Sequence, residues 1–234
     1  MKNAYKKFAY FYDEVMSEMN YDLWVEFTQE FIKKDDKILD LACGTGTFVT
    51  MLKLNGYDFV EGSDLSDEII EIANEKRKIN RLDINFYVAD MTNFKVDVKK
   101  DVITCFFDSV NFLKNDNELK KLFNCVYNAL NPNGLFIFDI FSKEMLKEYE
   151  NNILDEDYET FKIKWITKRI DAYNLCHNIT IYDNDEEIHE SYTEHYFDIN
   201  KCLDKRFKVL KISSDFNDDL EPEDERILIV LKKI

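Results

Sequence analysis

Apolar residues recur with two different spacings along the middle of the chain. Leu119, Leu122, Phe123, Val126 and Leu130 are spaced like one face of a helix, which predicts an amphipathic helix. Short, mostly apolar runs alternate with helical stretches and predict strands at residues 37–42, 57–61, 84–89, 101–107 and 135–140. Strands that are apolar on both faces are typical of a parallel sheet covered on both sides. Residues 37–141 are therefore predicted to form a doubly wound α/β sheet.

The two flanks of this region follow other patterns. Residues 4–34 are predicted to be helical, with Leu23, Phe27 and Phe31 on one face. Residues 158–198 alternate between apolar and polar positions, which favours antiparallel hairpins. Strands return at 207–213 and 226–231. We therefore predict a core made of residues 1–154 and 199–234, and an antiparallel β lid inserted at 155–198 between the fifth and sixth core strands.

Glycine is scarce, so each position carries information about the backbone. The chain has five Gly and two Pro in 234 residues. Gly44 and Gly46 follow the first predicted strand, where the absence of a Cβ allows a ligand to approach the backbone. Gly62 is predicted to end the second strand, and Ser66 to cap the helix that follows it. We predict that substitution of Gly46 by Val abolishes ligand binding and leaves the chain folded.

Four aspartates lie at the carboxyl ends of predicted strands, where open α/β sheets bind their ligands. Asp40 lies inside the first strand, and Asp64, Asp90 and Asp108 end or follow the next three. Val49 occupies the position where a dinucleotide fingerprint needs its third glycine. Asp40 beside the loop also disfavours a diphosphate, whereas a carboxylate at position 64 suits ribose hydroxyls. These features favour a cationic ligand with a ribose and no phosphate, which describes S-adenosylmethionine.

Successive segments resemble the motifs of class I S-adenosylmethionine-dependent methyltransferases. The matching segments are Asp40-Leu-Ala-Cys-Gly-Thr-Gly46, Gly62-Ser-Asp-Leu-Ser66, Ala89-Asp-Met91, Asp108-Ser-Val-Asn-Phe-Leu113 and Leu130 to Asp139. Residues 225–232 are similar to the last strand of this family. Residues 8–13 and 21–24 resemble a small-molecule subgroup in which leading helices close over the cofactor. The resemblance implies a Rossmann-like, mostly parallel sheet with an antiparallel last strand.

The resemblance also implies roles for individual residues. Asp64 binds the ribose hydroxyls, Asp90 accepts from the adenine amino group, and Asp40 lies near the amino group of the methionine portion. The implied cofactor-binding residues are Asp40, Ala42, Gly44, Gly46, Asp64, Leu65, Asp90, Met91, Tyr21 and Trp24. Asp108, Asn111 and Tyr12 are candidates for orienting the acceptor or taking its proton, because a general base is needed only when the nucleophile arrives protonated.

The histidines and the lid aromatics leave alternatives open. His177, His189 and His195 are interpreted as surface or core residues, and His195 is the best site candidate because Tyr192 and Tyr196 can line a cavity beside it. Aromatic residues in the lid are predicted to form an apolar wall that selects the acceptor. Their alternative role is packing on the core or in a homodimer interface. These lid aromatics are Trp165, Tyr182, Tyr192 and Tyr196.

Composition narrows the class of acceptor and partner. The 47 acidic and 31 basic residues give a formal net charge of −16, which argues against nucleic acid as a partner. The segment Asp108-Ser-Val-Asn111 also lacks the Asn/Asp-Pro-Pro-aromatic motif of methyltransferases that act on nucleic-acid amino groups. A small-molecule acceptor is therefore predicted. A protein or tRNA acceptor is left open. Two alternative functions also remain: a noncatalytic adenosyl-ligand binding protein, and an aminopropyl transferase that uses decarboxylated S-adenosylmethionine.

Further features predict the cellular compartment. No apolar run approaches the roughly 18 residues of a membrane helix, and the N-terminal residues lack a signal-peptide core. The five cysteines are widely spaced and include no Cys-x-x-Cys pair, so neither a metal site nor a disulfide framework is expected. We predict a cytoplasmic protein that does not enter a membrane.

Overall fold

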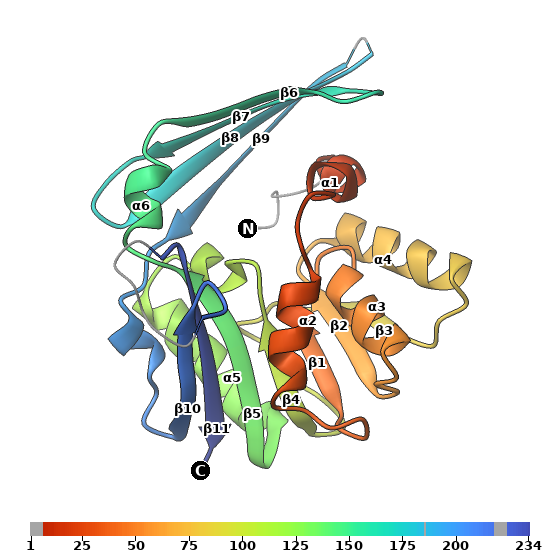
Figure 1. Ribbon diagram of the computed structural model, residues 1–234, viewed down its shortest axis with the longest axis vertical. Coiled ribbons are helices and arrows are strands. Elements are labelled where there is room, and N and C mark those ends of the chain that lie inside the picture. The colour runs from red at the N-terminus through yellow and green to blue at the C-terminus, as the bar shows by residue number, and fades with distance from the viewer. Residues whose placement is uncertain (1–6, 185, 218–223) are drawn as a thin grey trace.

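A seven-stranded, mostly parallel sheet forms the centre of the protein (Figure 1). The computed structural model describes residues 7–184, 186–217 and 224–234. The strand order is β10-β11-β5-β4-β1-β2-β3, and β11 runs antiparallel to both of its neighbours. The predicted Rossmann-like sheet with an antiparallel last strand is thus confirmed. Its strands are β1 (Ile38–Leu41), β2 (Val60–Asp64), β3 (Asn85–Val88), β4 (Lys100–Cys105), β5 (Leu130–Phe141), β10 (Phe207–Ser214) and β11 (Arg226–Lys233).

Helices cover both faces of this sheet because its strands are apolar on both sides. In β5, Phe136 and Phe138 pack into the cluster that contains the buried face of α5, whereas Ile137 belongs to the cluster on the opposite face. That second cluster includes Trp24 of α2. The helices are α1 (Ala9–Val15), α2 (Asp22–Gln29), α3 (Thr47–Leu54), α4 (Asp67–Ile79) and α5 (Asp116–Ala129). In the described parts of the chain, no helix has the length and apolar character needed to cross a membrane.

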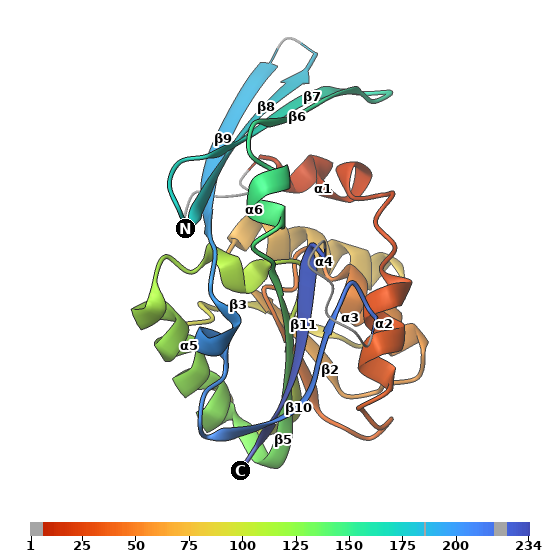
Figure 2. The same cartoon turned by 60° about the vertical axis from the view of Figure 1, so that its left-hand side comes forward.

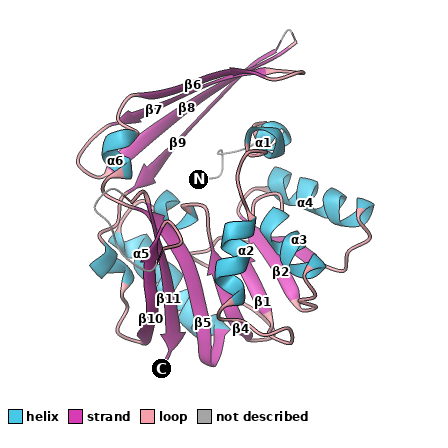
Figure 3. Cartoon of the chain, viewed as in Figure 1, coloured by secondary structure: helices cyan, strands magenta, loops and turns pink. Residues whose placement is uncertain are grey.

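A separate antiparallel sheet is inserted between β5 and β10 (Figure 3). Its strands follow one another as β6 (Asn152–Asp157), β7 (Lys162–Arg169), β8 (Asn174–Asp183) and β9 (Glu186–His195). The short helix α6 (Met145–Glu148) leads into this sheet, and the 3-10 helix η2 (Ile199–Cys202) follows it. The predicted antiparallel insert is confirmed. Pairing of β6 with β7 begins at Asn152, three residues before the predicted start of the lid.

The inner face of the inserted sheet packs on the first helix. Phe8 is fully buried in one cluster with Phe161, Ile163 and Tyr192 of the lid. Figures 1 and 2 show α1 between the inserted sheet and α4. The Oε1 atom of Glu190 in β9 accepts hydrogen bonds from the Lys7 and Phe8 backbone N–H groups, at 2.7 and 3.0 Å. The lid therefore holds the beginning of α1 through both apolar and polar contacts.

Two local predictions differ from the structure. The N-terminal helical region is two short helices, α1 and α2; residues 4–6 of the predicted span lie outside the described residues. Gly62 lies inside β2 instead of ending a strand. A Cβ at Gly62 would be 2.7 Å from the Phe86 ring and 2.8 Å from Cys43 Sγ. Position 62 is therefore glycine because Phe86 and Cys43 pack closely against it, and not because the chain turns there.

Candidate active site

A cavity of about 500 Å³ opens where the sheet order reverses, beside β1 and β4. Its walls come from α1, α2, the loop after β1, the end of β2 with the start of α4, the end of β3, and the segment after β4. Ligands of open α/β sheets bind at this position because the loops separate there. Eight of the predicted site residues line the cavity: Tyr12, Tyr21, Ala42, Gly44, Asp64, Leu65, Asp90 and Met91.

The loop after β1 reaches the cavity through an unusual backbone. Ala42, Gly44 and Gly46 have φ angles of 53°, 54° and 79°, in the left-handed region that favours glycine. A Cβ at Gly44 would have the Tyr12 ring as its nearest neighbour, at 3.9 Å, so this glycine faces open space in the cavity. A Cβ at Gly46 would lie 2.5 Å from Phe86 Cζ. Packing inside the core thus explains why position 46 is glycine. Gly46 does not line the cavity.

Asp64 joins the glycine loop to the next helix. Its Oδ2 accepts a hydrogen bond from the Gly44 N–H at 3.1 Å, and its Oδ1 accepts from the Ser66 N–H at 3.0 Å. Burial raises the pKa of this carboxyl, and the backbone donors oppose that rise. Ser66 caps α4 as predicted, because its hydroxyl accepts from the Ile69 N–H. The carboxylate is therefore fixed at the cavity wall by two backbone contacts.

Asp90 and Met91 provide the wall beyond β3. Asp90 Oδ1 accepts hydrogen bonds from the backbone N–H and the hydroxyl of Thr92, both at 2.8 Å. These contacts leave Asp90 Oδ2 without a partner among the described residues. Leu65 and Met91 both line the cavity and are only half-buried. This part of the cavity combines apolar walls with a free carboxylate oxygen.

Asp13 attaches the first helix to the glycine loop, a contact that the sequence analysis missed. Asp13 Oδ1 accepts from the Thr45 hydroxyl at 2.5 Å, and Asp13 Oδ2 pairs with Lys76 Nζ at 2.8 Å. Lys76 Nζ also donates to the hydroxyls of Thr45 and Thr47, at 3.1 Å each. The partners of Asp13 are 32 and 63 residues away. No local pattern marks such a contact.

Tyr12 and Tyr21 cover the cavity from above the glycine loop. Their side chains share a hydrogen bond, and burial together with the nearby Asp13 carboxylate raises the pKa of Tyr21 to about 12. The Tyr21 ring lies 4.8 Å from the ring of Phe107, which also lines the cavity. Tyr21 therefore remains protonated, and both tyrosines add aromatic surface to the site.

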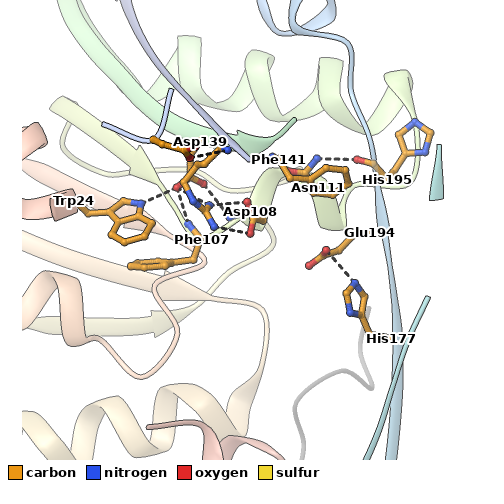
Figure 4. Close-up of polar contacts among 11 residues, drawn as sticks. Trp24, Phe107, Asp108, Asn111, Asp139, Phe141, His177, Glu194 and His195 are labelled. Atoms are coloured by element: carbon orange, nitrogen blue, oxygen red, sulfur yellow. Dashed lines mark hydrogen bonds and ion pairs between the residues drawn. The ribbon is translucent and has the colours of Figure 1, made fainter. Parts of the chain in front are cut away.

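Two predicted cofactor residues, Trp24 and Asp40, do not line the cavity. The Trp24 Nε1–H donates to Asp139 Oδ2 at 2.7 Å, and its ring packs in the core (Figure 4). The Asp40 side chain is 4% exposed and accepts a hydrogen bond from the Thr104 hydroxyl at 2.6 Å. Burial raises the pKa of Asp40 to about 7. Both residues belong to the layer beneath the cavity.

Asp108 and Asn111 hold neighbouring elements together. Arg226 donates to both carboxylate oxygens of Asp108, at 2.6 and 3.0 Å, and lies 3.1 Å from Asp139 Oδ2 (Figure 4). Burial and the Asp139 carboxylate raise the pKa of Asp108, whereas Arg226 lowers it. Asn111 is fully buried; its Nδ2 donates to the His195 carbonyl and its Oδ1 accepts from the Phe141 N–H. Neither side chain lines the cavity.

A buried pair in the lid was not among the predicted site residues. His177 Nε2 lies 3.1 Å from Glu194 Oε2, and the Trp165 Nε1–H donates to His177 Nδ1 at 3.1 Å. The His177 ring stacks on Tyr192, whose ring stacks on Phe112 at a centroid distance of 5.1 Å. Phe112 lines the cavity. The lid thus contacts the cavity wall through stacked rings.

His195 lies away from the main cavity. Its Nδ1 is 2.8 Å from Asn174 Oδ1, and burial lowers its pKa. It lines a second cavity, of about 590 Å³, together with Tyr196 between the lid base and η2. Tyr196 packs with Phe141 near α6. His195 and Tyr196 therefore line a cavity as predicted, but Tyr192 does not, and this cavity is separate from the glycine loop.

Comparison with known proteins supplies the family. A profile described as a methyltransferase domain matches residues 38–134. A putative methyltransferase of Geobacillus sp. (strain WCH70) is 30% identical, with 98% of this chain and 100% of the relative covered. The crystal structure of an S-adenosylmethionine-dependent methyltransferase from Clostridium acetobutylicum is 29% identical, with a TM-score of 0.84 and 99% of both chains covered. CalS10, an amino pentose methyltransferase from Micromonospora echinaspora solved with S-adenosylmethionine bound, is 16% identical, with a TM-score of 0.73 over 100% of both chains.

Proposed function

Since this chain belongs to the class I S-adenosylmethionine-dependent methyltransferases, we propose that it methylates a small-molecule acceptor in the cavity between the glycine loop and the lid. The observation that carries the proposal is a cavity of about 500 Å³ whose wall includes Tyr12 of α1 and Phe112, on which Tyr192 of the lid stacks. This volume is within the usual range of small-ligand sites, about 300–1,000 Å³. CalS10, which shares the fold, acts on an amino pentose.

The residues at the cavity wall fit S-adenosylmethionine. Gly44 faces open space where a Cβ would intrude, and Asp64 presents a carboxylate that is fixed by backbone donors. Asp90 keeps one carboxylate oxygen without a partner among the described residues. Among the described lining residues there is no Lys or Arg to receive a diphosphate. These features suit a ligand with a ribose, an adenine and positive charge.

We assign the following roles to residues of the cavity wall. Asp64 accepts hydrogen bonds from the ribose hydroxyls, and Asp90 Oδ2 accepts from the adenine amino group. Leu65 and Met91 pack against the adenine. When bound, S-adenosylmethionine supplies an electrophilic methyl group on a sulfonium, and the task of the protein is to orient the acceptor and exclude water. Tyr12 and other cavity aromatics exclude water from the acceptor end.

Roles for the remaining predicted residues follow from their contacts. Tyr12 is the predicted catalytic residue that lines the cavity, and we propose that its hydroxyl orients the acceptor. Asp108 and Asn111 act as positioning residues, because their side chains bind Arg226 and two backbone groups. Asp40 and Trp24 support the loop and α2 from below.

Contacts within the chain bear on the lid and on assembly. Trp165 and Tyr192 pack against Phe8 and Phe112 in the same chain, so these two aromatics give no reason to expect a homodimer. We propose that the lid selects the acceptor through Phe112, which Tyr192 supports.

All five cysteines are free thiols, which supports our proposal that the protein acts in the cytoplasm.

Labelled cofactor tests the small-molecule proposal directly. The protein is incubated with S-adenosylmethionine labelled in its methyl group and with an ultrafiltered extract of the cells that produce it. We expect a labelled small product by mass spectrometry, and less of it with the Asp64→Ala variant at a cofactor concentration that does not saturate the variant. Label that enters only retained protein or RNA in an unfiltered extract would overturn the small-molecule acceptor.

A further inference from the structure

The acceptor end of the cavity is aromatic. Four of the five aromatic residues that line the cavity come from α1, the residue before α2 and the segment after β4: Tyr12, Tyr21, Phe107 and Phe112. Tyr21 and Phe107 are in contact, with 4.8 Å between ring centroids, and stacking on Tyr192 supports Phe112 from behind. Ring faces carry partial negative charge and attract ammonium groups that lose part of their hydration.

The charged residues described in the lining of the cavity are all acidic. The described residues that line it include four acids, Asp64, Asp67, Glu68 and Asp90, and no Lys, Arg or His. Two cations lie close behind the wall, and carboxylates hold both of them: Arg226 by Asp108 and Asp139, and Lys76 by Asp13. Neither cation is free to bind an anionic acceptor.

Two further carboxylates lie behind the aromatic end. The field of Asp13 contributes to the raised pKa of Tyr21, and Glu194 pairs with His177, which stacks on Tyr192 behind Phe112. A low-dielectric pocket with carboxylates of one sign attracts cations and repels carboxylates and phosphates. The aromatic rings and the acidic surroundings therefore favour the same class of ligand.

We propose that the acceptor is an amine that enters the cavity as an ammonium ion and is held on the faces of these rings. This proposal rests on the proposed function and names the substrate class of the same site. The ammonium must release one proton before its nitrogen becomes a nucleophile, and that proton goes to solvent water. The same charges disfavour acceptors whose nucleophile is a carboxylate or that carry a phosphate.

Binding of three matched probes tests the proposal without turnover. Protein saturated with S-adenosylhomocysteine is titrated calorimetrically with benzylamine, benzyl alcohol and benzoate, which share a ring and differ in charge. We expect benzylamine to bind at least about tenfold more tightly than benzoate, as cation–π contact and the acidic field predict. Equal affinities, a preference for benzoate, or no binding of benzylamine would overturn the proposal.

Variants of Tyr21 locate the binding site. Tyr21→Leu should reduce benzylamine affinity about five- to tenfold and leave benzyl alcohol affinity within about twofold. Tyr21→Phe keeps the ring and should retain the preference. Tyr10→Leu is the matched control, because Tyr10 lies on α1 but is 65% exposed and does not line the cavity. If Tyr10→Leu and Tyr21→Leu have the same effect, the amine does not bind on these rings.

The charge of the natural product distinguishes the amine proposal from the broader proposal that the acceptor is a small molecule. Labelled product from the cell extract is applied to cation and anion exchangers at neutral pH. Retention on the cation exchanger supports the amine. A labelled small product that is neutral or anionic overturns the amine proposal and leaves methylation of a small molecule intact. Label confined to macromolecules overturns both.

Discussion

Asp13 accepts a hydrogen bond from the Thr45 hydroxyl at 2.5 Å, and this contact attaches the first helix to the glycine loop. Because Tyr12 precedes Asp13 in the same helix, the contact also fixes an aromatic residue over the cavity. The side chain of Asp13 is 45% exposed, so its ion pair with Lys76 contributes little by itself. Its importance lies in positioning the helix.

We predict that Asp13→Ala lowers affinity for S-adenosylhomocysteine about fivefold, in line with the loss of one charge-assisted hydrogen bond at a partly exposed site. Calorimetric titration measures this change. Glu14→Ala, at the exposed neighbouring position, serves as the control and should bind like the unmodified protein. Unchanged affinity in Asp13→Ala would show that α1 needs no attachment to the loop.

Replacement of Asp64 should have the largest effect on cofactor affinity. Asp64→Ala removes the proposed acceptor of the ribose hydroxyls and also the partner of the Gly44 and Ser66 N–H groups. We expect affinity to weaken by about 1–3 kcal/mol, measured by calorimetry with S-adenosylhomocysteine. Asp58→Ala, whose side chain is 77% exposed, is the control. If both variants bind equally well, Asp64 is not part of the binding site.

The structure changes the prediction made for Gly46. Because a Cβ there would meet the Phe86 ring and the φ angle is 79°, Gly46→Ala should destabilise the fold by about 1–3 kcal/mol. Thermal denaturation followed by circular dichroism measures this loss. Adding Phe86→Leu should recover part of it, since the clash is relieved while the φ strain remains. A Gly46→Ala variant with an unchanged Tm would contradict this account.

Asp40 should make stability depend on pH. Burial raises the pKa of the Asp40 carboxyl from its ordinary value of 3.8 to about 7 in the folded chain, so the folded state binds more protons than the unfolded state between these values. The contribution of Asp40 to the free energy of unfolding is therefore fully present below about pH 4. This contribution is lost as the pH rises through 7. Asp40→Asn removes this dependence, and we expect it to gain stability relative to the unmodified protein between pH 5 and pH 8. Urea unfolding at pH 5 and pH 8 measures the difference in the free energy of unfolding between the variant and the unmodified protein. If this difference is the same at both pH values, the pKa of Asp40 is not raised.

Two tyrosines of the lid should differ in their effects. Tyr192 supports Phe112 at the cavity, whereas Tyr196 packs with Phe141 near α6. Tyr192→Ala should therefore lower turnover with the extract acceptor about tenfold or more, and leave affinity for S-adenosylhomocysteine within about twofold. Tyr196→Ala should retain turnover. Equal losses in both variants would mean that the lid acts through its stability and not through Phe112.

Residues whose roles depend on nearby sequence were predictable from the sequence. Gly44, Asp64 and Asp90 are positioned by the strand or the turn next to them, so their place at one edge of the sheet follows from the α/β pattern. Ser66 is the same kind of case, because its capping partner is three residues away. The central sheet was predictable for a related reason: each βα unit is identified by a local change in hydrophobic spacing.

Residues whose partners are distant in the chain were not predictable in this way. Trp24 points into the core because Asp139, 115 residues later, accepts its N–H. Asn111 turns away from the cavity because its partners include the carbonyl of His195, 84 residues later. Gly62 resembled a turn because the close packing of Phe86 across the strand leaves no trace in the local pattern. Tertiary contacts decided each of these positions.

The seven residues of α1 are held at one end by Glu190 of the lid and at the other by Thr45 of the glycine loop. These two attachments tie the lid and the glycine loop to one short segment that carries Tyr12 of the cavity wall. We therefore expect a change that loosens the lid to loosen this wall of the cavity as well, because the same helix contacts both.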